Sequence, residues 1–196
     1  VTTALTLTDG IVFTDATNLL VIRDNATTNG GSAISFVDGP MKKIGDDLFV
    51  FPVGDGSTWA RLGIASVSNF GVDTEFTCQY LHSGYSNTTS LDASLTNVST
   101  IEHWLLDRVF DTGNNASCTV RLFWESESAS AIEHPSDLRV AHYYTGSSGL
   151  KWYSFGDETG GTDNGNGSGS ILSTTTFTSF SPITFGSGEG FNPLPV

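Results

Sequence analysis

Two acidic turns carry the side chains with the clearest potential to bind a ligand. Asp46 and Asp47 follow a glycine, and Asp55 stands between two glycines. Calcium takes about six to eight oxygen ligands from carboxylates, carbonyls and water, so these residues predict a calcium site. Asp157 and Asp163, in a second glycine-rich segment, are further candidates. Neither segment matches a full EF-hand loop, and solvated turn residues are the alternative interpretation.

Aromatic side chains offer a second kind of site. Sugar rings stack on exposed aromatic faces while nearby polar groups bind their hydroxyls. Trp59, Tyr85, Trp152 and Tyr153 are the candidates for such a glycan surface. Trp152 and Tyr153 are consecutive, so on a strand they point to opposite faces and one of them is a candidate for exposure. Ordinary core or sheet-surface packing is the alternative.

The two cysteines each lie in a strand-like segment. Cys78 falls within 75–80 and Cys118 within 117–123. Two cysteines in a domain of secreted composition suggest one disulfide, which would close a loop of roughly 40 residues and stabilise the fold by about 3–4 kcal/mol. Two unpaired buried thiols are the alternative.

Catalytic signatures are weak in this sequence. The four histidines, His82, His103, His134 and His142, show neither a His-x-His nor a His-Glu-x-x-His spacing, so a zinc site is unsupported. No Gly-x-Ser-x-Gly turn opening a helix is evident, and catalysis needs titratable groups that converge. We therefore predict a protein that is not an enzyme, with calcium as the one cofactor worth testing.

The candidate residues described above lie on or between predicted β-strands. In the central stretch 34–64, short apolar runs are separated by Gly-Pro, Gly-Asp-Asp and Gly-Asp-Gly turns. About eleven such strands follow one another with turns between them and no convincing helix. The segment 101–110 could be drawn as a helix, but its flanking strands favour an extended conformation. The sequence thus predicts an all-β fold, a β-sandwich or jelly roll, over residues 29–185.

The two ends of the chain look different from this central domain. Residues 1–28 alternate Thr and Leu between small turns, which resembles a rung of a β-solenoid, and Asp9-Gly10 is a hairpin-type signal. One rung cannot bury its own face, so we expect these strands to dock on the main sheet or to swap into a neighbour. Residues 186–196 are rich in Gly and Pro and predict an extended tail.

Composition narrows the class of protein. The 196 residues include 38% hydrophobic but only 15% charged residues, which is typical of extracellular all-β proteins. The net charge of −13 disfavours binding to nucleic acid or to an anionic membrane surface. No apolar run approaches the roughly 20 residues of a membrane helix, so membrane insertion is not predicted.

Five motifs resemble a known kind of domain. They are Ser-Phe-Val-Asp-Gly-Pro-Met-Lys-Lys at 35–43, Phe-Pro-Val-Gly-Asp-Gly at 51–56, Glu-His-Trp-Leu-Leu-Asp-Arg at 102–108, Phe-Ser-Pro-Ile-Thr-Phe-Gly at 180–186 and Asn-Pro-Leu-Pro-Val at 192–196. In this order they resemble the β-rich domain that precedes the C-terminal sorting domain in Bacteroidetes-type surface proteins exported by type IX secretion. The resemblance implies export, a multidomain parent and no established activity.

These observations together predict a non-catalytic module displayed outside the cell. It would act as an adhesin or a structural subunit, and self-association through its terminal strands would build a head-to-tail filament by strand addition. The alternative is a carbohydrate-binding module of a secreted polysaccharide-degrading enzyme, with surface glycans as partners.

Overall fold

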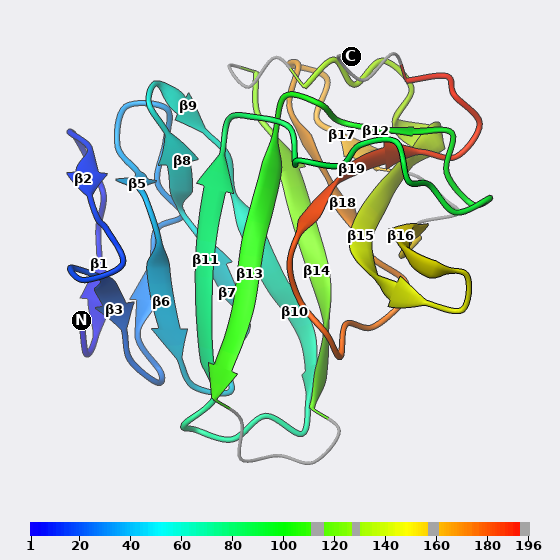
Figure 1. Ribbon diagram of the computed structural model, residues 1–196. Coiled ribbons are helices and arrows are strands. Elements are labelled where there is room, and N and C mark those ends of the chain that lie inside the picture. The colour runs from blue at the N-terminus through cyan, green and yellow to red at the C-terminus, as the bar shows by residue number, and fades with distance from the viewer. Residues whose placement is uncertain (111–115, 127–129, 157–160, 193–196) are drawn as a thin grey trace.

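Short strands dominate the chain. The computed structural model describes residues 1–110, 116–126, 130–156 and 161–192, and 47% of the chain is in strands. The one helical element in this described part is the 3-10 helix η1 (Pro135–Asp137), so the predicted all-β class is confirmed. The arrangement of several sheets is consistent with a β-sandwich (Figure 1).

The first layer of the sandwich is an antiparallel five-stranded sheet. Antiparallel pairing suits strands that present one apolar face to a core and the other to solvent. In spatial order its strands are β17 (Thr162–Asp163), β18 (Gly169–Leu172), β14 (Ser117–Trp124), β10 (Leu62–Ser68) and β7 (Phe49–Phe51).

The second layer is an eight-stranded sheet. Segment 101–110 contributes one of its strands, so the extended conformation predicted there is confirmed. In spatial order the sheet contains β16 (Gly149–Ser154), β15 (Leu138–Gly146), β19 (Ile183–Ser187), β13 (His103–Phe110), β11 (Glu75–Leu81), β6 (Met41–Ile44) and β3 (Leu20–Ile22), with β12 (Asn97–Val98) beside β19.

The core lies between these layers. Alternating residues of β11 are buried, as the two-residue period of a half-buried strand requires. Trp104 on β13 and Trp124 on β14 are 0% and 4% exposed. Their rings lie 5.3 and 6.4 Å from the ring of Phe185, so aromatic contacts bridge the two sheets.

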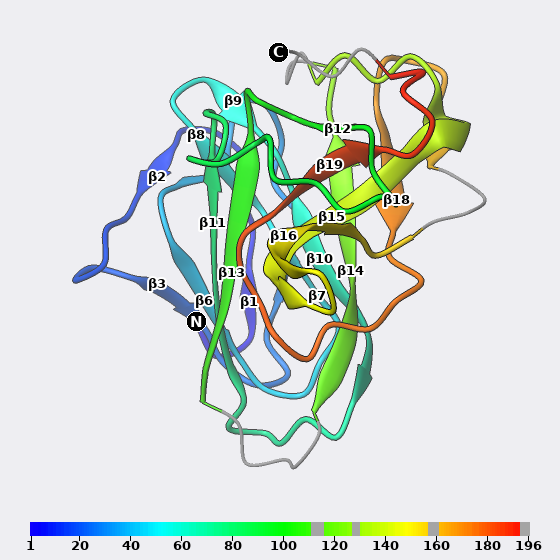
Figure 2. The ribbon, with the colours of Figure 1, turned by 45° about the vertical axis from the view of Figure 1, so that its right-hand side comes forward.

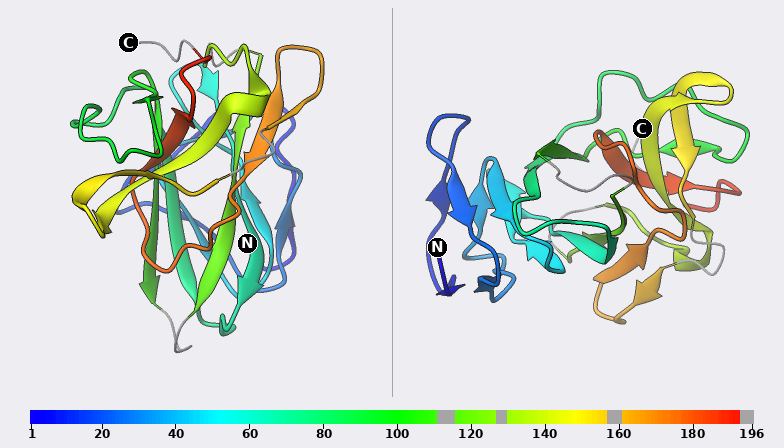
Figure 3. Two further views of the ribbon diagram at one scale, coloured as in Figure 1. Left: turned by 90° about the vertical axis from the view of Figure 1, so that its right-hand side faces the viewer. Right: turned by 90° about the horizontal axis from the view of Figure 1, so that it is seen from below.

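The N-terminal quarter forms parallel rungs that stack on the edge of the sandwich (Figures 2 and 3). We call residues 1–22 rung 1 and residues 23–44 rung 2. Each strand of rung 1 pairs in parallel with its counterpart in rung 2, on three separate sheets. The pairs are β1 (Ala4–Leu5) with β4 (Thr27–Thr28), β2 (Val12–Phe13) with β5 (Val37–Asp38), and β3 with β6; β8 (Val53–Asp55) continues the second sheet and β9 (Thr58–Trp59) closes it.

Parallel pairing corrects one prediction. The Asp9-Gly10 turn does not make a hairpin, because β1 and β2 lie in different sheets and pair with rung 2 instead of with each other. Strands of one rung are separated by corners, and their partners come about 21–25 residues later in the sequence. The first 28 residues are thus docked on their own chain, and the parallel stacking continues to Asp55.

The C-terminal segment differs from the predicted tail up to residue 192. Gly186 and Ser187 belong to β19, which lies inside the eight-stranded sheet between β15 and β13. Asn192 is fully buried, and its side-chain oxygen accepts hydrogen bonds from the backbone N–H groups of Glu133 and His134. Residues 193–196 lie outside the described residues. The first rung and the last described residues therefore mark opposite sides of the molecule (Figure 1).

Candidate functional site

Three carboxylates meet where the two rungs join. Asp46 and Asp47 lie in the turn between β6 and β7, and Asp24 lies in the turn between β3 and β4. Each of the three offers an oxygen within 4.8 Å of the others. Gly45 makes this approach possible, because its φ is 130° and a Cβ there would lie 2.4 Å from Asp24 Oδ1.

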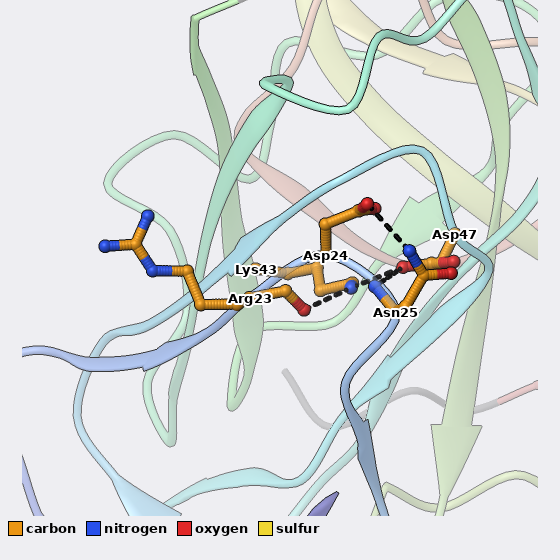
Figure 4. Close-up of polar contacts among 5 residues, drawn as sticks. All are labelled: Arg23, Asp24, Asn25, Lys43 and Asp47. Carbon is orange, nitrogen blue, oxygen red and sulfur yellow. Dashed lines mark hydrogen bonds and ion pairs between the residues drawn. The ribbon is translucent and has the colours of Figure 1, made fainter. Parts of the chain in front are cut away.

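A buried lysine supplies positive charge inside this cluster (Figure 4). Lys43 is 1% exposed, and its Nζ donates to Asp47 Oδ2 at 2.7 Å and to the backbone oxygen of Arg23 at 2.9 Å. The backbone N–H of Asn25 donates to the same Asp47 oxygen at 2.7 Å. Burial raises the pKa of Asp47, but the bonds from Lys43 and Asn25 outweigh burial and leave that pKa below its usual value.

The predicted calcium ligands are therefore only partly brought together. Asp46 and Asp47 do converge, and they do so with Asp24, which the sequence reasoning missed. Asp55 lies elsewhere and accepts a hydrogen bond from the backbone N–H of His82, at 3.0 Å. Asp163 accepts one from Gly165 within its own turn. Asp157 lies outside the described residues.

The chemistry of this donor set resembles an internal ion-pair lock more than a calcium site. Calcium needs about six to eight oxygens, whereas one of these three carboxylates is already bound by an ammonium group. Asp24 Oδ2 accepts from the side-chain amide of Asn25 at 2.8 Å, and Asp24 Oδ1 is buried with no hydrogen-bond partner in the described part of the chain. The cluster holds the turn after rung 1 against the turn after rung 2.

Shallow grooves lie beside the cluster. One, of about 350 Å³, is lined by residues 25–28 and 47–50. A second, of about 240 Å³, is lined by residues 48–50, 63–65 and Arg121. Leu48 belongs to both and is 64% exposed. The first groove has a mixed lining of apolar residues, Asn25, two threonines and Asp47, and the second is mainly apolar with Arg121 at its side. Neither groove is lined by a histidine.

The four predicted glycan-stacking residues do not form one exposed row. Trp152 is fully buried and Tyr153 is 8% exposed, on the opposite face of β16. Tyr85 packs against Trp152 at a ring separation of 5.8 Å. Trp59 is half-buried, and the guanidinium of Arg61 lies 4.5 Å from its ring centroid. Two of the four aromatic side chains are thus buried, and the two half-buried ones pack against other side chains of the protein.

The predicted disulfide is not formed. Cys78 and Cys118 are both buried and free. They lie on β11 and β14, in different sheets, and facing sheets are about 10 Å apart, so inward-facing positions alone do not bring two sulfurs into bonding distance. Burial raises the pKa of both thiols, to about 12 for Cys118. The alternative, two buried thiols in the core, is what the structure shows.

The histidines are in four separate places. His82 Nδ1 lies 3.0 Å from Thr58 Oγ1, and His103 Nδ1 lies 2.6 Å from the backbone oxygen of Ser83. His142 lies among aromatic rings, and His134 is beside Phe191. Burial lowers the pKa of His103 below its usual value and that of His142 to about 4. None of these contacts joins a histidine to a carboxylate.

Three buried acids, Glu102, Glu125 and Asp137, escaped the sequence reasoning. Glu102 is 0% exposed, and the Tyr80 hydroxyl donates to its Oε2 at 3.1 Å. Burial raises the pKa of Glu102 to about 7, against smaller opposite effects of hydrogen bonds from Ser130 and Tyr80. No spacing signal marks Glu102, which lies directly before β13 and is followed by ordinary strand residues.

Asp137, another of these acids, ties down the C-terminal segment. Its carboxylate accepts hydrogen bonds from the Ser187 hydroxyl and from the backbone N–H groups of Glu189 and Phe191, the last two at 2.6 and 2.8 Å. The Pro-Ser-Asp sequence of η1 indicates a turn that contains Asp137. It does not indicate the hydrogen-bond partners of Asp137, which are about 50 residues away in sequence.

Comparison of the chain with protein-family models, with curated proteins and with solved structures finds no match. Within the described residues, no helix is both long enough and apolar enough to cross a bilayer.

Proposed function

We propose that this chain is a non-catalytic module that is exported and serves as a structural or adhesive unit of a cell-surface protein. The observation that carries the proposal is the in-line build of the molecule. Parallel rungs lie at one end, and the last described residues are fastened at the other (Figure 1). A domain whose first rung and last described residues lie at opposite ends is suited to be one unit of a longer cell-surface protein.

The use of the titratable side chains supports this reading. Lys43 and Asp47 lock the rungs, and Asp137 locks the C-terminal segment. The histidines are dispersed, and two of the three clustered carboxylates, those of Asp24 and Asp47, accept hydrogen bonds from within the protein. Acid–base catalysis needs titratable groups that converge on a substrate. Lys43 and Asp137 instead form hydrogen bonds with backbone groups of the protein itself.

Export and surface location rest on composition and on the five motifs that resemble a domain of type IX secretion cargo. Few charged residues, a net charge of −13 and abundant small polar residues suit an extracellular β module. The filament version by strand addition has less support, because β19 is already paired on both sides in its own sheet and is not free to be donated.

Two experiments test the proposal, one for location at the cell surface and one for activity on polysaccharides. An antibody against residues 29–185 should label intact cells that produce the protein, and protease treatment of those cells should remove the label. Labelling only after permeabilisation would overturn the proposal. Incubation of purified protein with a polysaccharide panel should release no product, and retention on a polysaccharide that Trp59→Ala abolishes would favour the carbohydrate-binding alternative.

A further inference from the structure

The outer end of rung 1 is an open edge on three sheets at once. β2 ends one sheet, β3 ends the eight-stranded sheet, and β1 ends its two-stranded sheet. The backbone N–H groups of Gly10, Val12 and Thr14 donate to rung 2, so those of the alternate residues Ile11 and Phe13 point toward the open edge. An edge of this kind is a template for another strand.

The apolar interior of the rungs is only partly covered at this end, although Leu7 and Ile22 of rung 1 are buried. Val12 is half-buried, whereas Val37 and Val53, its successive partners in the same ladder, are 0% exposed. Leu20 is half-buried, whereas its partner Met41 is 0% exposed. Rung 1 therefore buries rung 2, whereas in the described part of the chain no strand, and at β3 only Val1, pairs with the outer side of rung 1.

Val1 shows how a further strand would lie on that edge. The amino group of Val1 donates to the backbone oxygen of Val21 at 2.8 Å, and the N–H of Arg23 donates to the oxygen of Val1 at 2.9 Å. This pattern is a parallel bridge between Val1 and Ile22. Ile22 in turn pairs in parallel with Lys43, so Val1, Ile22 and Lys43 follow one another at intervals of 21 residues in one ladder.

We propose that the outer edge of rung 1 is a docking surface for one further parallel β-solenoid rung, of about 21 residues, continuous with the backbone at Val1. The proposal rests on the structural role proposed above and names the partner of that scaffold. The register is set by the Val1–Ile22–Lys43 ladder, and the interior of the added rung must be apolar to cover Val12 and Leu20. Rung-on-rung stacking is the interface that the chain already uses between rungs 1 and 2.

The test extends the whole chain by one rung. A copy of residues 1–21 is fused directly ahead of Val1, and backbone hydrogen exchange is measured for Ile11, Phe13 and Val21, whose N–H groups face the open edge. We expect exchange at these three positions to slow by at least about tenfold compared with the unextended chain. Equal exchange rates in the two proteins would overturn the proposal.

Two controls separate docking from mere extension. A scrambled copy of the same 21 residues should leave the exchange unchanged, and equal slowing with it would overturn the proposal. Phe13→Pro removes an outward-facing donor while leaving the bonds to rung 2, and proline is tolerated on an edge strand. In the extended chain this substitution should restore fast exchange at Ile11; retained protection would contradict pairing at β2.

A second copy of the chain is the competing occupant. If it covers this edge, the unextended protein will be a dimer in light scattering, with Ile11 and Val21 already protected and with both features lost in Phe13→Pro; that result would overturn the proposal. These measurements use purified protein, so their failure is distinguishable from failure of surface labelling on cells.

Discussion

The Nζ atom of Lys43 lies 2.7 Å from Asp47 Oδ2, and the lysine side chain is 1% exposed. This pair, together with the bond from Lys43 to the backbone oxygen of Arg23, fastens the turn that follows rung 1 to the turn that follows rung 2. An ammonium group that is buried this deeply has lost most of its hydration. The bonds to Asp47 and to the backbone oxygen of Arg23 replace that water.

Lys43→Met should destabilise the protein by about 2–4 kcal/mol, because it leaves Asp47 and the Arg23 carbonyl without their charged donor. Urea unfolding at pH 7 measures the change. Lys42→Met is the matched control, since the Lys42–Glu75 pair is 20% and 28% exposed and its loss should cost less than about 1 kcal/mol. Equal costs for the two lysines would show that burial does not distinguish them.

Glu102→Gln should change how stability depends on pH. The folded pKa of about 7 is above the ordinary 4.5, so the folded state keeps a proton that the unfolded state releases. This residue therefore costs stability as pH rises from about 4.5 to about 7, by about 3 kcal/mol. The variant should remove that loss and gain stability, relative to the wild type, above pH 7.

His142 has the opposite effect on the pH dependence of stability, over nearly the same pH range as Glu102. The effect of Glu102 is therefore measured as the difference between the variant and the wild type. Its folded pKa of about 4 is below the ordinary 6.5, so its contribution to stability is lost as pH falls from 6.5 to about 4. The wild type should thus show a shallow profile in denaturant titrations between pH 4 and 7. A profile that Glu102→Gln leaves unchanged would mean that Glu102 is not buried as described.

Asp137→Asn should loosen the C-terminal segment. The side chain accepts bonds from the backbone N–H groups of Glu189 and Phe191 at 2.6 and 2.8 Å. Burial raises the pKa of Asp137, but the bonds from Ser187, Glu189 and Phe191 outweigh burial and leave that pKa below its usual value. The variant should lose about 1–2 kcal/mol and speed hydrogen exchange at those two N–H groups. Asp163→Asn, at an exposed turn, should change neither quantity; unaltered exchange in Asp137→Asn would contradict the clamp.

The cysteines should behave as buried free thiols. Thiol reagent under native conditions should react with neither Cys78 nor Cys118, and in denaturant without reductant it should titrate both. Reductant should leave the melting temperature unchanged. A melting temperature that falls with reductant, together with no titratable thiols in denaturant, would show that a disulfide exists.

Calcium should leave the melting temperature within about 1 °C at about 1 mM, because Lys43 already neutralises Asp47 and few oxygens remain. The measurement is a calorimetric scan with calcium and with chelator. A saturable rise that Asp24→Asn abolishes and Asp163→Asn keeps would instead establish a calcium site at this cluster.

The sequence alone predicted the all-β class and the inward face of its most regular strand. Alternation in segment 118–124 places Cys118 and Trp124 toward the core, and both are buried there, because side-chain direction follows a local two-residue period. The same locality explains why Asp46 and Asp47 were recognisable as a turn.

Only the tertiary structure decided which strands pair and in which direction. Asp9-Gly10 has the local chemistry of a hairpin, yet β2 pairs in parallel with β5, since a parallel partner is chosen by stacking and not by the turn. The same holds for Asp24 beside Asp47, for Asp137 beside Phe191, and for two cysteines that stay apart. Local periods fix where a side chain points, whereas the contacts between distant segments depend on the free energy of packing the whole core.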